Sequence, residues 1–330
     1  MLTATCERPV SFTGPLATVF HGLIAEKQGA GYRYDATAHD LVPLDRFCVE
    51  VGHCEASLPR EVVLRWAAKR DHETEATRQH RISLIRIVGE YMQRCGYPAY
   101  VHPRHAVGPT PPRYIPYIFS HIELARLFAC IDACEPDRAS LVRHRVFPLL
   151  FRLLYGSGLR ISEALALQVE DIDLSLGTVR VRHAKFGKER VVPLHPSLVG
   201  RLREYLQAPF QLAETDRSVF PSPHGGAYRA DTVYRYFRRF LWAAGISHGG
   251  RSRGPRVHDL RHTFAVHCLQ RWVTDGVDLS VALPYLSVYL GHTGLKGTQD
   301  YLRLTADLYP DIVAAVERRF GPLLPGGQSQ

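Results

Sequence analysis

The chain has 330 residues, of which 45% are hydrophobic, so it can form one large globular domain or two smaller ones. Its formal net charge of +9, from 41 Lys and Arg against 32 Asp and Glu, favours a polyanionic partner such as nucleic acid. Seven cysteines without a C-x-x-C pair predict free thiols in a reducing compartment. No stretch has the pattern of a secretion signal or a membrane span, which predicts a cytoplasmic protein.

The first hundred residues have a helical pattern, because apolar residues recur there at helical spacing. The predicted helices cover 15–27, 41–51, 61–69 and 75–95. The stretch 96–116 holds six prolines and two glycines and no such pattern, which predicts an extended connector. We therefore predict a helical domain at 1–100, a linker at 101–116, a second domain at 117–324 and a tail at 325–330.

The second domain combines helical patterns with one strand signal. Ser120 and Glu123 have the spacing of a capping box, which predicts a helix start. Residues 178–183 and 190–194 alternate on both sides of a turn with glycine, which predicts a β-hairpin. Helices are predicted at 146–155, 160–167, 197–206, 231–244, 259–272, 281–290 and 309–320. The predicted fold is mainly α, with a small β-hairpin or sheet in the second domain.

Five cationic or proton-transferring side chains stand beside glycine or turn signals, where a rigid frame can hold a side chain exposed. They are Arg160, Lys185, His258, Arg261 and His292. Arginine offers a planar fork that matches two phosphate oxygens, while histidine and lysine can exchange protons with the entering and leaving oxygens. Each residue alone is more often a solvated or ion-paired side chain, but together they suit one phosphate.

Metal and nucleotide sites have little support in these motifs. The segment 258–262 resembles the zinc-binding H-E-x-x-H pattern, but Asp259 replaces the glutamate and Arg261 would place a positive charge beside the ion. The segment 291–298 contains glycines and a lysine but lacks the Gly-Lys-Ser/Thr ending of a phosphate-binding loop. We expect neither a metal nor a nucleoside triphosphate.

The order of the motifs resembles that of the tyrosine recombinases, the phage-integrase family. Residues 153–167 resemble the first signature box of the family, and residues 258–265 resemble its second, His-x-x-Arg. Residues 290–292 together with 298–301 resemble the third, and Lys185 matches the hairpin lysine. The resemblance covers about two thirds of the chain. It implies the two-domain architecture of that family, with a helical core-binding (SAM-like) domain before the catalytic domain.

The resemblance also implies the chemistry of the site. Two arginines would hold the scissile phosphate, two histidines would donate hydrogen bonds or move protons, a lysine would protonate the departing 5′ oxygen, and a tyrosine would attack. These residues are Arg160 and Arg261, His258 and His292, Lys185, and Tyr301. A free phenol has a pKa of about 10, so this nucleophile needs nearby cations and a proton acceptor. The 3′-phosphotyrosyl ester conserves the energy of the broken bond, so no cofactor is expected.

Three further residues have roles that the resemblance suggests. Phe186 follows Lys185 where relatives commonly have a small residue, which leaves Lys188 as an alternative acid, although the alignment of the following strand favours Lys185. Glu163 and Asp171 occupy positions at which the family has acidic residues. We expect these two carboxylates to support the site by orienting side chains or capping a turn.

Double-stranded DNA with specific recombination sites is the partner that the resemblance implies. The two domains would close around the duplex, and candidate contacts are basic residues in both. They are Arg78, Arg81, Arg86, Lys188, Arg253 and Arg256. The resemblance implies a homotetramer on paired sites and a monomer or dimer off DNA, with accessory DNA-bending proteins as further partners. The apolar stripe within 309–320 would pack on its own domain or on a neighbouring protomer.

The sequence thus predicts a site-specific DNA recombinase, associated with the nucleoid, that serves as the integrase or transposase of a mobile element. Three alternatives share some of its features. They are a chromosome-dimer-resolving recombinase, a type IB-like topoisomerase, and a catalytically silent DNA-binding regulator.

Overall fold

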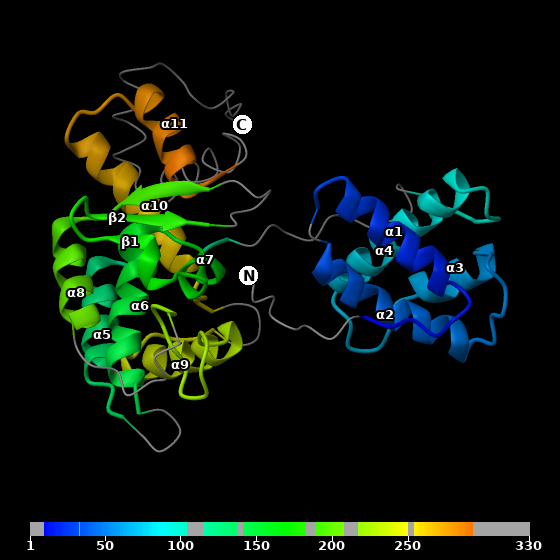
Figure 1. Ribbon diagram of the computed structural model, residues 1–330, viewed down its shortest axis with the longest axis horizontal. Coiled ribbons are helices and arrows are strands. Elements are labelled where there is room, and N and C mark those ends of the chain that lie inside the picture. Colours follow the sequence, from blue (N-terminus) through cyan, green and yellow to red (C-terminus); the bar gives the residue numbers. More distant parts are fainter. Residues whose placement is uncertain are drawn as a thin grey trace, which may run out of the picture. The chain divides into compact units, whose positions relative to one another are not determined.

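The computed structural model describes most of the chain in seven stretches. These are residues 10–32, 34–103, 115–136, 141–182, 189–207, 217–249 and 254–292. The chain forms two compact units, Met1–Tyr114 and Ile115–Gln330 (Figure 1). Each unit has a hydrophobic core of its own.

The N-terminal unit is built from helices in its described part. They are α1 (Ala17–Gly29), α2 (Asp35–Glu50), α3 (Arg60–Ala67) and α4 (Glu75–Arg94). Their apolar faces meet in a core that includes the buried side chains of Phe20, Leu44 and Trp66. The helices predicted from periodicity are confirmed, although α2 begins six residues earlier than the apolar pattern predicts, at Asp35 rather than Leu41.

The C-terminal unit is mostly helical and contains one small sheet. Its described helices are α5 (His121–Asp132), α6 (Arg143–Ser157), α7 (Ile161–Leu165), α8 (Pro196–Gln207), α9 (Ala230–Ala243), α10 (Asp259–Thr274) and α11 (Leu279–Leu290), with a short 3-10 helix, η2 (Val169–Asp171). The predicted capping box at Ser120 and Glu123 starts α5. The predicted fold class, mainly α with a small sheet, is confirmed. None of the described helices is long and apolar enough to cross a membrane.

The sheet is antiparallel and has the order β1 (Ile172–Asp173), β2 (Thr178–Val181), β3 (Arg190–Pro193). The hairpin predicted from alternation is confirmed, and its pairing ends where Val181 lies opposite Arg190. The sequence did not indicate β1, because a strand of two residues is too short to show alternation.

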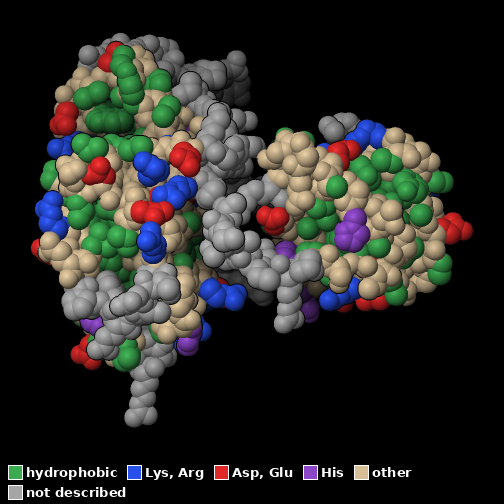
Figure 2. Space-filling model, viewed as in Figure 1, with side chains coloured by type: hydrophobic (Ala, Val, Ile, Leu, Met, Phe, Trp, Pro, Cys, Tyr) green, Lys and Arg blue, Asp and Glu red, His purple; other side chains and the backbone are tan. Residues whose placement is uncertain are grey.

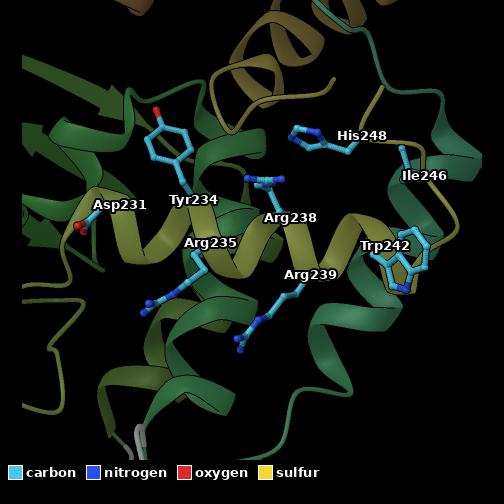
Figure 3. Close-up of a pocket in the computed structure, with 8 residues that line it drawn as sticks. All are labelled: Asp231, Tyr234, Arg235, Arg238, Arg239, Trp242, Ile246 and His248. Atoms are coloured by element: carbon cyan, nitrogen blue, oxygen red, sulfur yellow. The ribbon is translucent and has the colours of Figure 1, made fainter. Parts of the chain in front are cut away.

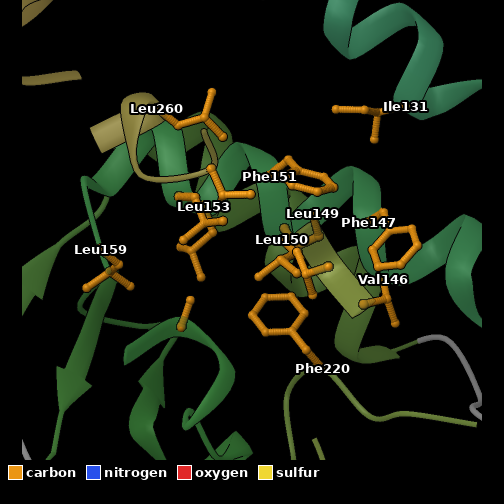
Figure 4. Close-up of a cluster of buried hydrophobic side chains, with 14 of the residues drawn as sticks. Ile131, Val146, Phe147, Leu149, Leu150, Phe151, Leu153, Leu159, Phe220 and Leu260 are labelled. Atoms are coloured by element: carbon orange, nitrogen blue, oxygen red, sulfur yellow. The ribbon is translucent and has the colours of Figure 1, made fainter. Parts of the chain in front are cut away.

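Helix α6 is central to this unit, because it packs against α5, α8 and α10. Its apolar side chains, including Phe147, Leu150 and Phe151, form much of the core, which Leu159 and Leu260 also enter (Figure 4). In Figure 1, α11 and α9 lie at opposite ends of this unit. The core therefore holds the end of α6 and the start of α10 in fixed positions, and both segments carry predicted site residues.

Candidate active site

The turn between α6 and α7 requires a glycine. Gly158 ends α6 with φ +61°, in the left-handed region that favours glycine. A Cβ atom there would lie 2.6 Å from Cδ1 of Phe264 on α10 and 2.8 Å from Cδ2 of Leu290 on α11. The close approach of these three helices thus depends on the missing side chain. Arg160 follows at once, as the residue before the first turn of α7.

Glu163 joins two arginines at the start of α7. One carboxylate oxygen accepts the backbone N–H of Arg160 (2.9 Å), and the other accepts Nη1 of the same arginine (2.7 Å). Arg190, at the start of β3, donates to both oxygens, at 3.0 and 2.9 Å. Burial alone would raise the pKa of Glu163, but hydrogen bonds and charge from Arg190 and Arg160 lower it to about 2. This carboxylate is therefore ionised and hydrogen-bonded to Arg160.

Arg261 is almost fully buried, with 2% of its surface exposed. Its Nη1 donates to the carbonyl of Gly158 (2.7 Å), and its Nη2 donates to the carbonyl of Leu290 (2.6 Å). The side chain therefore ties α10 to the end of α6 and to the end of α11. These two bonds fix the plane of the guanidinium.

His292 follows α11 and is placed by the way this helix ends. Gly291 has φ +67°, and the N–H groups of Gly291 and His292 donate to the carbonyls of Val288 and Ser287, both at 2.9 Å. This is the Schellman arrangement, which closes a helix on a left-handed glycine. It fixes the backbone of His292 directly beside the carbonyls that Arg160 and Arg261 contact.

The site histidines are held in the neutral form. Burial, followed by the charges of Arg261 and Arg160, lowers the pKa of His258 and of His292 to about 4 in each case. The ring of His262 lies edge-on to that of His258, with ring centroids 4.7 Å apart. A neutral imidazole can accept a proton at one nitrogen and donate a hydrogen bond from the other.

Four of the six predicted catalytic residues therefore lie together where α7, α10 and α11 meet. They are Arg160, His258, Arg261 and His292. Lys185 and Tyr301 lie outside the described residues, as do the DNA-contact candidates Lys188 and Arg253. Within the described ranges, no three His, Cys, Asp or Glu side chains are grouped as metal ligands would be.

Asp171 contacts residues other than these four predicted catalytic residues. Its carboxylate accepts the backbone N–H of Gln168 (2.9 Å) and pairs with Arg182, which follows β2. Glu170 pairs with the same arginine at 3.0 Å. Asp171 therefore caps η2 and pairs with the residue that follows β2, whereas Glu163 contacts a predicted phosphate ligand directly. The supporting role of both carboxylates stays a prediction.

The structure corrects the expectation that Arg81 contacts DNA. Its guanidinium is buried, donates to both carboxylate oxygens of Glu73 (2.6 Å each), and also donates to the backbone carbonyls of Trp66 and Ala68. A cation paired in this way stabilises the N-terminal unit and is not free for a phosphate. The remaining described candidates, Arg78, Arg86 and Arg256, stay predictions.

The basic face of α9 is a feature that the motifs did not reveal. Arg235, Arg238 and Arg239 line an open hollow of about 810 Å³ together with Tyr234 and Trp242 (Figure 3). Trp242 has 86% of its surface exposed, although exposed tryptophan is unusual. The sequence signal was present, since these residues recur at helical spacing opposite the buried face of α9. Helix α9 packs against α7, so this face belongs to the unit that carries Arg160.

Basic and acidic side chains lie close together on the face of the C-terminal unit that Figure 2 shows. The ion pairs of this unit include that of Arg217 with Glu170 (3.1 Å). The arginines of α9 differ, because Asp231 is the only acidic residue among those that line their hollow. The residues that line this hollow on α9 therefore carry more positive than negative charge.

Comparison with known proteins identifies similar sequences. The model of the phage integrase family matches residues 120–307. A Sinorhizobium fredii protein named as an integrase/recombinase, y4rB, is 30% identical over 90% of this chain and 95% of its own length. The tyrosine recombinase XerA of Pyrococcus furiosus is 32% identical over 64% of each chain.

Solved structures share the fold. The integrase of transposon Tn1549, in complex with a circular intermediate DNA, superposes with a TM-score of 0.60 at 16% identity, over 86% of this chain and 94% of that one. A lambda integrase dimer bound to a core site gives a TM-score of 0.57 at 16% identity, over 84% and 95% of the two chains.

Proposed function

The chain belongs to the phage integrase family of tyrosine recombinases, and on this premise we propose which of its residues cut and rejoin DNA. It is a site-specific recombinase that acts on DNA. We propose that Tyr301 attacks the scissile phosphate and leaves a 3′-phosphotyrosyl bond. The observation that carries this proposal is the meeting of Arg160, Arg261 and His292 at the C-terminal end of α11.

The two arginines bind the phosphate in this mechanism. Phosphoryl transfer builds up charge on the equatorial oxygens, and preorganised guanidinium groups stabilise it without reorganising during the reaction. Arg261 is held by the carbonyls of Gly158 and Leu290, and Arg160 is held by Glu163. The guanidinium groups of Arg160 and Arg261 are the proposed ligands of the two non-bridging oxygens.

The proton transfers then balance as follows. The Tyr301 oxygen forms a bond to phosphorus while its proton passes to neutral His258, and the bond from phosphorus to the 5′ oxygen breaks as Lys185 protonates that oxygen. His292 donates its N–H to a non-bridging oxygen. A bound phosphate raises the pKa of a nearby imidazole, so His258 can keep the proton until the reverse step. A 5′ hydroxyl from the second strand then attacks the phosphotyrosyl ester and passes its proton to Lys185, while the bond from phosphorus to Tyr301 breaks and Tyr301 takes the proton back from His258.

Chain connectivity is compatible with this assignment. Tyr301 is nine residues after His292, and nine extended residues span up to about 30 Å. Lys185 lies between the paired ends of β2 and β3, and the β3 end is bonded through Arg190 to Glu163. Both residues can therefore reach the phosphate that the arginines would hold.

We assign DNA contacts to the basic face of α9 and to the N-terminal unit, as the core-binding domain. Helix α9 has 14 residues and is therefore about 21 Å long, with arginines and aromatic side chains on one face. Such a face can contact phosphates and base edges in the major groove. Arg256 is exposed two residues before His258, where a DNA strand in the site would pass.

We further propose that the enzyme serves a mobile element. The similarity to the integrase/recombinase y4rB, which spans nearly the whole of both chains, supports this role. The similarity to XerA supports chromosome-dimer resolution as the second candidate. In either role the enzyme would act in the cytoplasm on nucleoid DNA, as a homotetramer on paired sites and with accessory DNA-bending proteins. Sequencing the DNA trapped as adduct would separate the two roles. A mobile-element enzyme should trap the ends of the element, whereas a chromosome-dimer resolvase should trap a single chromosomal site.

A nicked suicide substrate tests the mechanism. Loss of the small fragment beyond the nick prevents religation, so the wild-type protein should accumulate a covalent adduct and Tyr301→Phe should give none. Tyr285→Phe, at an exposed tyrosine on α11, is the control and should give the wild-type adduct. An adduct from Tyr301→Phe, or none from the wild-type protein, would overturn the proposal.

Supercoiled plasmids test recombination against topoisomerase activity. The cognate site is first recovered from DNA trapped as adduct, and plasmids with two sites, one site or none are then compared. We expect exchanged products only from paired sites. Relaxation without exchange, independent of the sites, would show a topoisomerase instead.

A further inference from the structure

Three arginines from three different segments hold the C-terminal end of α11. The carbonyls of residues 289, 290 and 291 accept hydrogen bonds from Arg190 Nε (3.0 Å), Arg261 Nη2 (2.6 Å) and Arg160 Nη2 (3.2 Å), respectively. The last carbonyls of a helix lack partners within the helix and carry partial negative charge, so cations are stabilising there. The backbone that leads into His292 is therefore fixed by guanidinium groups.

Arg190 differs from the other two arginines in where its donors point. Its Nη1 and Nη2 both donate to Glu163, its Nε donates to the carbonyl of Tyr289, and only 11% of its side chain is exposed. All three of its nitrogens are thus bonded to protein. Arg190 is therefore placed to hold the site together and is not placed to bind the phosphate.

Arg190 also packs directly against the backbone that precedes His292. A Cβ atom at Gly291 would lie 2.7 Å from its Nη1 and 2.9 Å from its Cζ. The same guanidinium shares Glu163 with Arg160. One side chain thus links the strand β3, the carboxylate that orients Arg160, and the helix end that places His292.

We propose that Arg190 is a positioning residue, which sets Arg160 and His292 at the correct separation for one phosphate. The inference rests on the proposed function, because it assigns these two residues to the same phosphate. A displacement of about 1 Å at a reacting group can cost about 100-fold in rate. Loss of Arg190 should therefore slow cleavage without removing any group that touches DNA.

Substitutions of Arg190 and of a matched arginine provide the test. Arg152 has a comparable set of bonds, with two hydrogen bonds to Asp132, one to the carbonyl of Pro148, and 16% of its side chain exposed, but it joins α6 to α5. We expect Arg190→Gln to form adduct about 100-fold more slowly than wild type, and Arg190→Lys about 10-fold more slowly, each with DNA affinity within about twofold. Arg152→Gln and Arg152→Lys should each lose an ion pair and keep the wild-type cleavage rate.

The pKa of His292 separates a positioning role of Arg190 from a general loss of stability. The charge of Arg190 is one of the causes, after burial, Arg261 and Arg160, that lower the pKa of His292. Arg190→Gln should therefore move the titration of His292 to higher pH, and Arg190→Lys, which keeps the charge, should restore it.

Titration of His292 by NMR in the full-length protein gives a readout that does not depend on cleavage. Arg190→Gln should raise the pKa of His292, and Arg152→Gln should leave it unchanged. Wild-type cleavage by Arg190→Gln, or an equal loss of rate in Arg152→Gln, would overturn the positioning role. No adduct from the wild-type protein, with the NMR shift present, would overturn the proposed function instead.

Discussion

Positively charged side chains surround the site histidines, and they make the free energy of unfolding depend on pH. Burial, then the charges of His258, Arg261 and His292, lowers the pKa of His262 from 6.5 to about 3. A histidine with a lowered folded-state pKa stabilises the fold fully above its unfolded pKa, and this contribution is lost as pH falls towards the folded pKa. The contribution of His262 is therefore lost progressively below pH 6.5.

We expect the free energy of unfolding to fall between pH 7.5 and pH 5. In His262→Gln the fall should be smaller, by on the order of 1 kcal/mol, because glutamine does not titrate. Urea unfolding at the two pH values measures the difference. Equal falls in the wild-type protein and in the variant would contradict the low pKa of His262.

Motif order predicted the residues that the structure brings together, but it could not predict Arg190. In the sequence this arginine is an ordinary member of an alternating strand, and its carboxylate partner, Glu163, lies on a helix that only the fold brings to it. Arg81 was mispredicted for the opposite reason. A helical arginine has the same sequence signal whether it faces solvent or, as here, a buried glutamate.

We expect the basic face of helix α9 to bind DNA phosphates. Its exposed arginines and aromatics lie opposite a buried face that includes Phe237 and Leu241, so α9 can offer its basic face to DNA while its packing stays intact. Each phosphate contact that is lost reduces the slope of log affinity against log salt by about 0.9. Replacing two contacting arginines should therefore weaken binding and flatten this slope by about 2.

The double variant Arg235→Ala, Arg238→Ala tests the predicted change of slope. Its binding to duplex DNA is measured from 50 to 200 mM salt, a range of about fourfold. Arg271→Ala is the control, because Arg271 is an exposed arginine on α10 that pairs with Asp275 (3.6 Å). It should keep the wild-type slope. A double variant with an unchanged slope would exclude α9 as a phosphate-binding face.

Elements with a full period of apolar residues were predicted well, and shorter or polar ones were not. The start of α2 was missed because residues 35–40 are mainly polar or small, with only Ala38 buried. The strand β1 was missed because two residues show no period. Tertiary contacts determine such segments: β1 exists because Ile172 and Asp173 pair with β2.

At the scale of the whole molecule, α11 carries an apolar stripe on its outer side. Val281, Tyr285 and Val288 follow one another at helical spacing, and the last two each have 72% of their surface exposed. Contiguous exposed apolar side chains commonly mark a protein interface. We expect this stripe to contribute to contacts between protomers in the proposed homotetramer on paired DNA sites.

A charged substitution in the stripe separates assembly from chemistry. Val288→Asp should reduce the tetrameric fraction on paired sites about tenfold, because burying one aspartate at an interface costs more than about 1.4 kcal/mol. Mass analysis of the DNA complexes measures this fraction. Adduct formation on a single suicide site should stay at the wild-type level. Leu176→Asp, at another exposed apolar position, should change neither. If Val288→Asp lowers the unfolding free energy of the protein without DNA, the chain's own tail covers the stripe and the interface assignment is wrong.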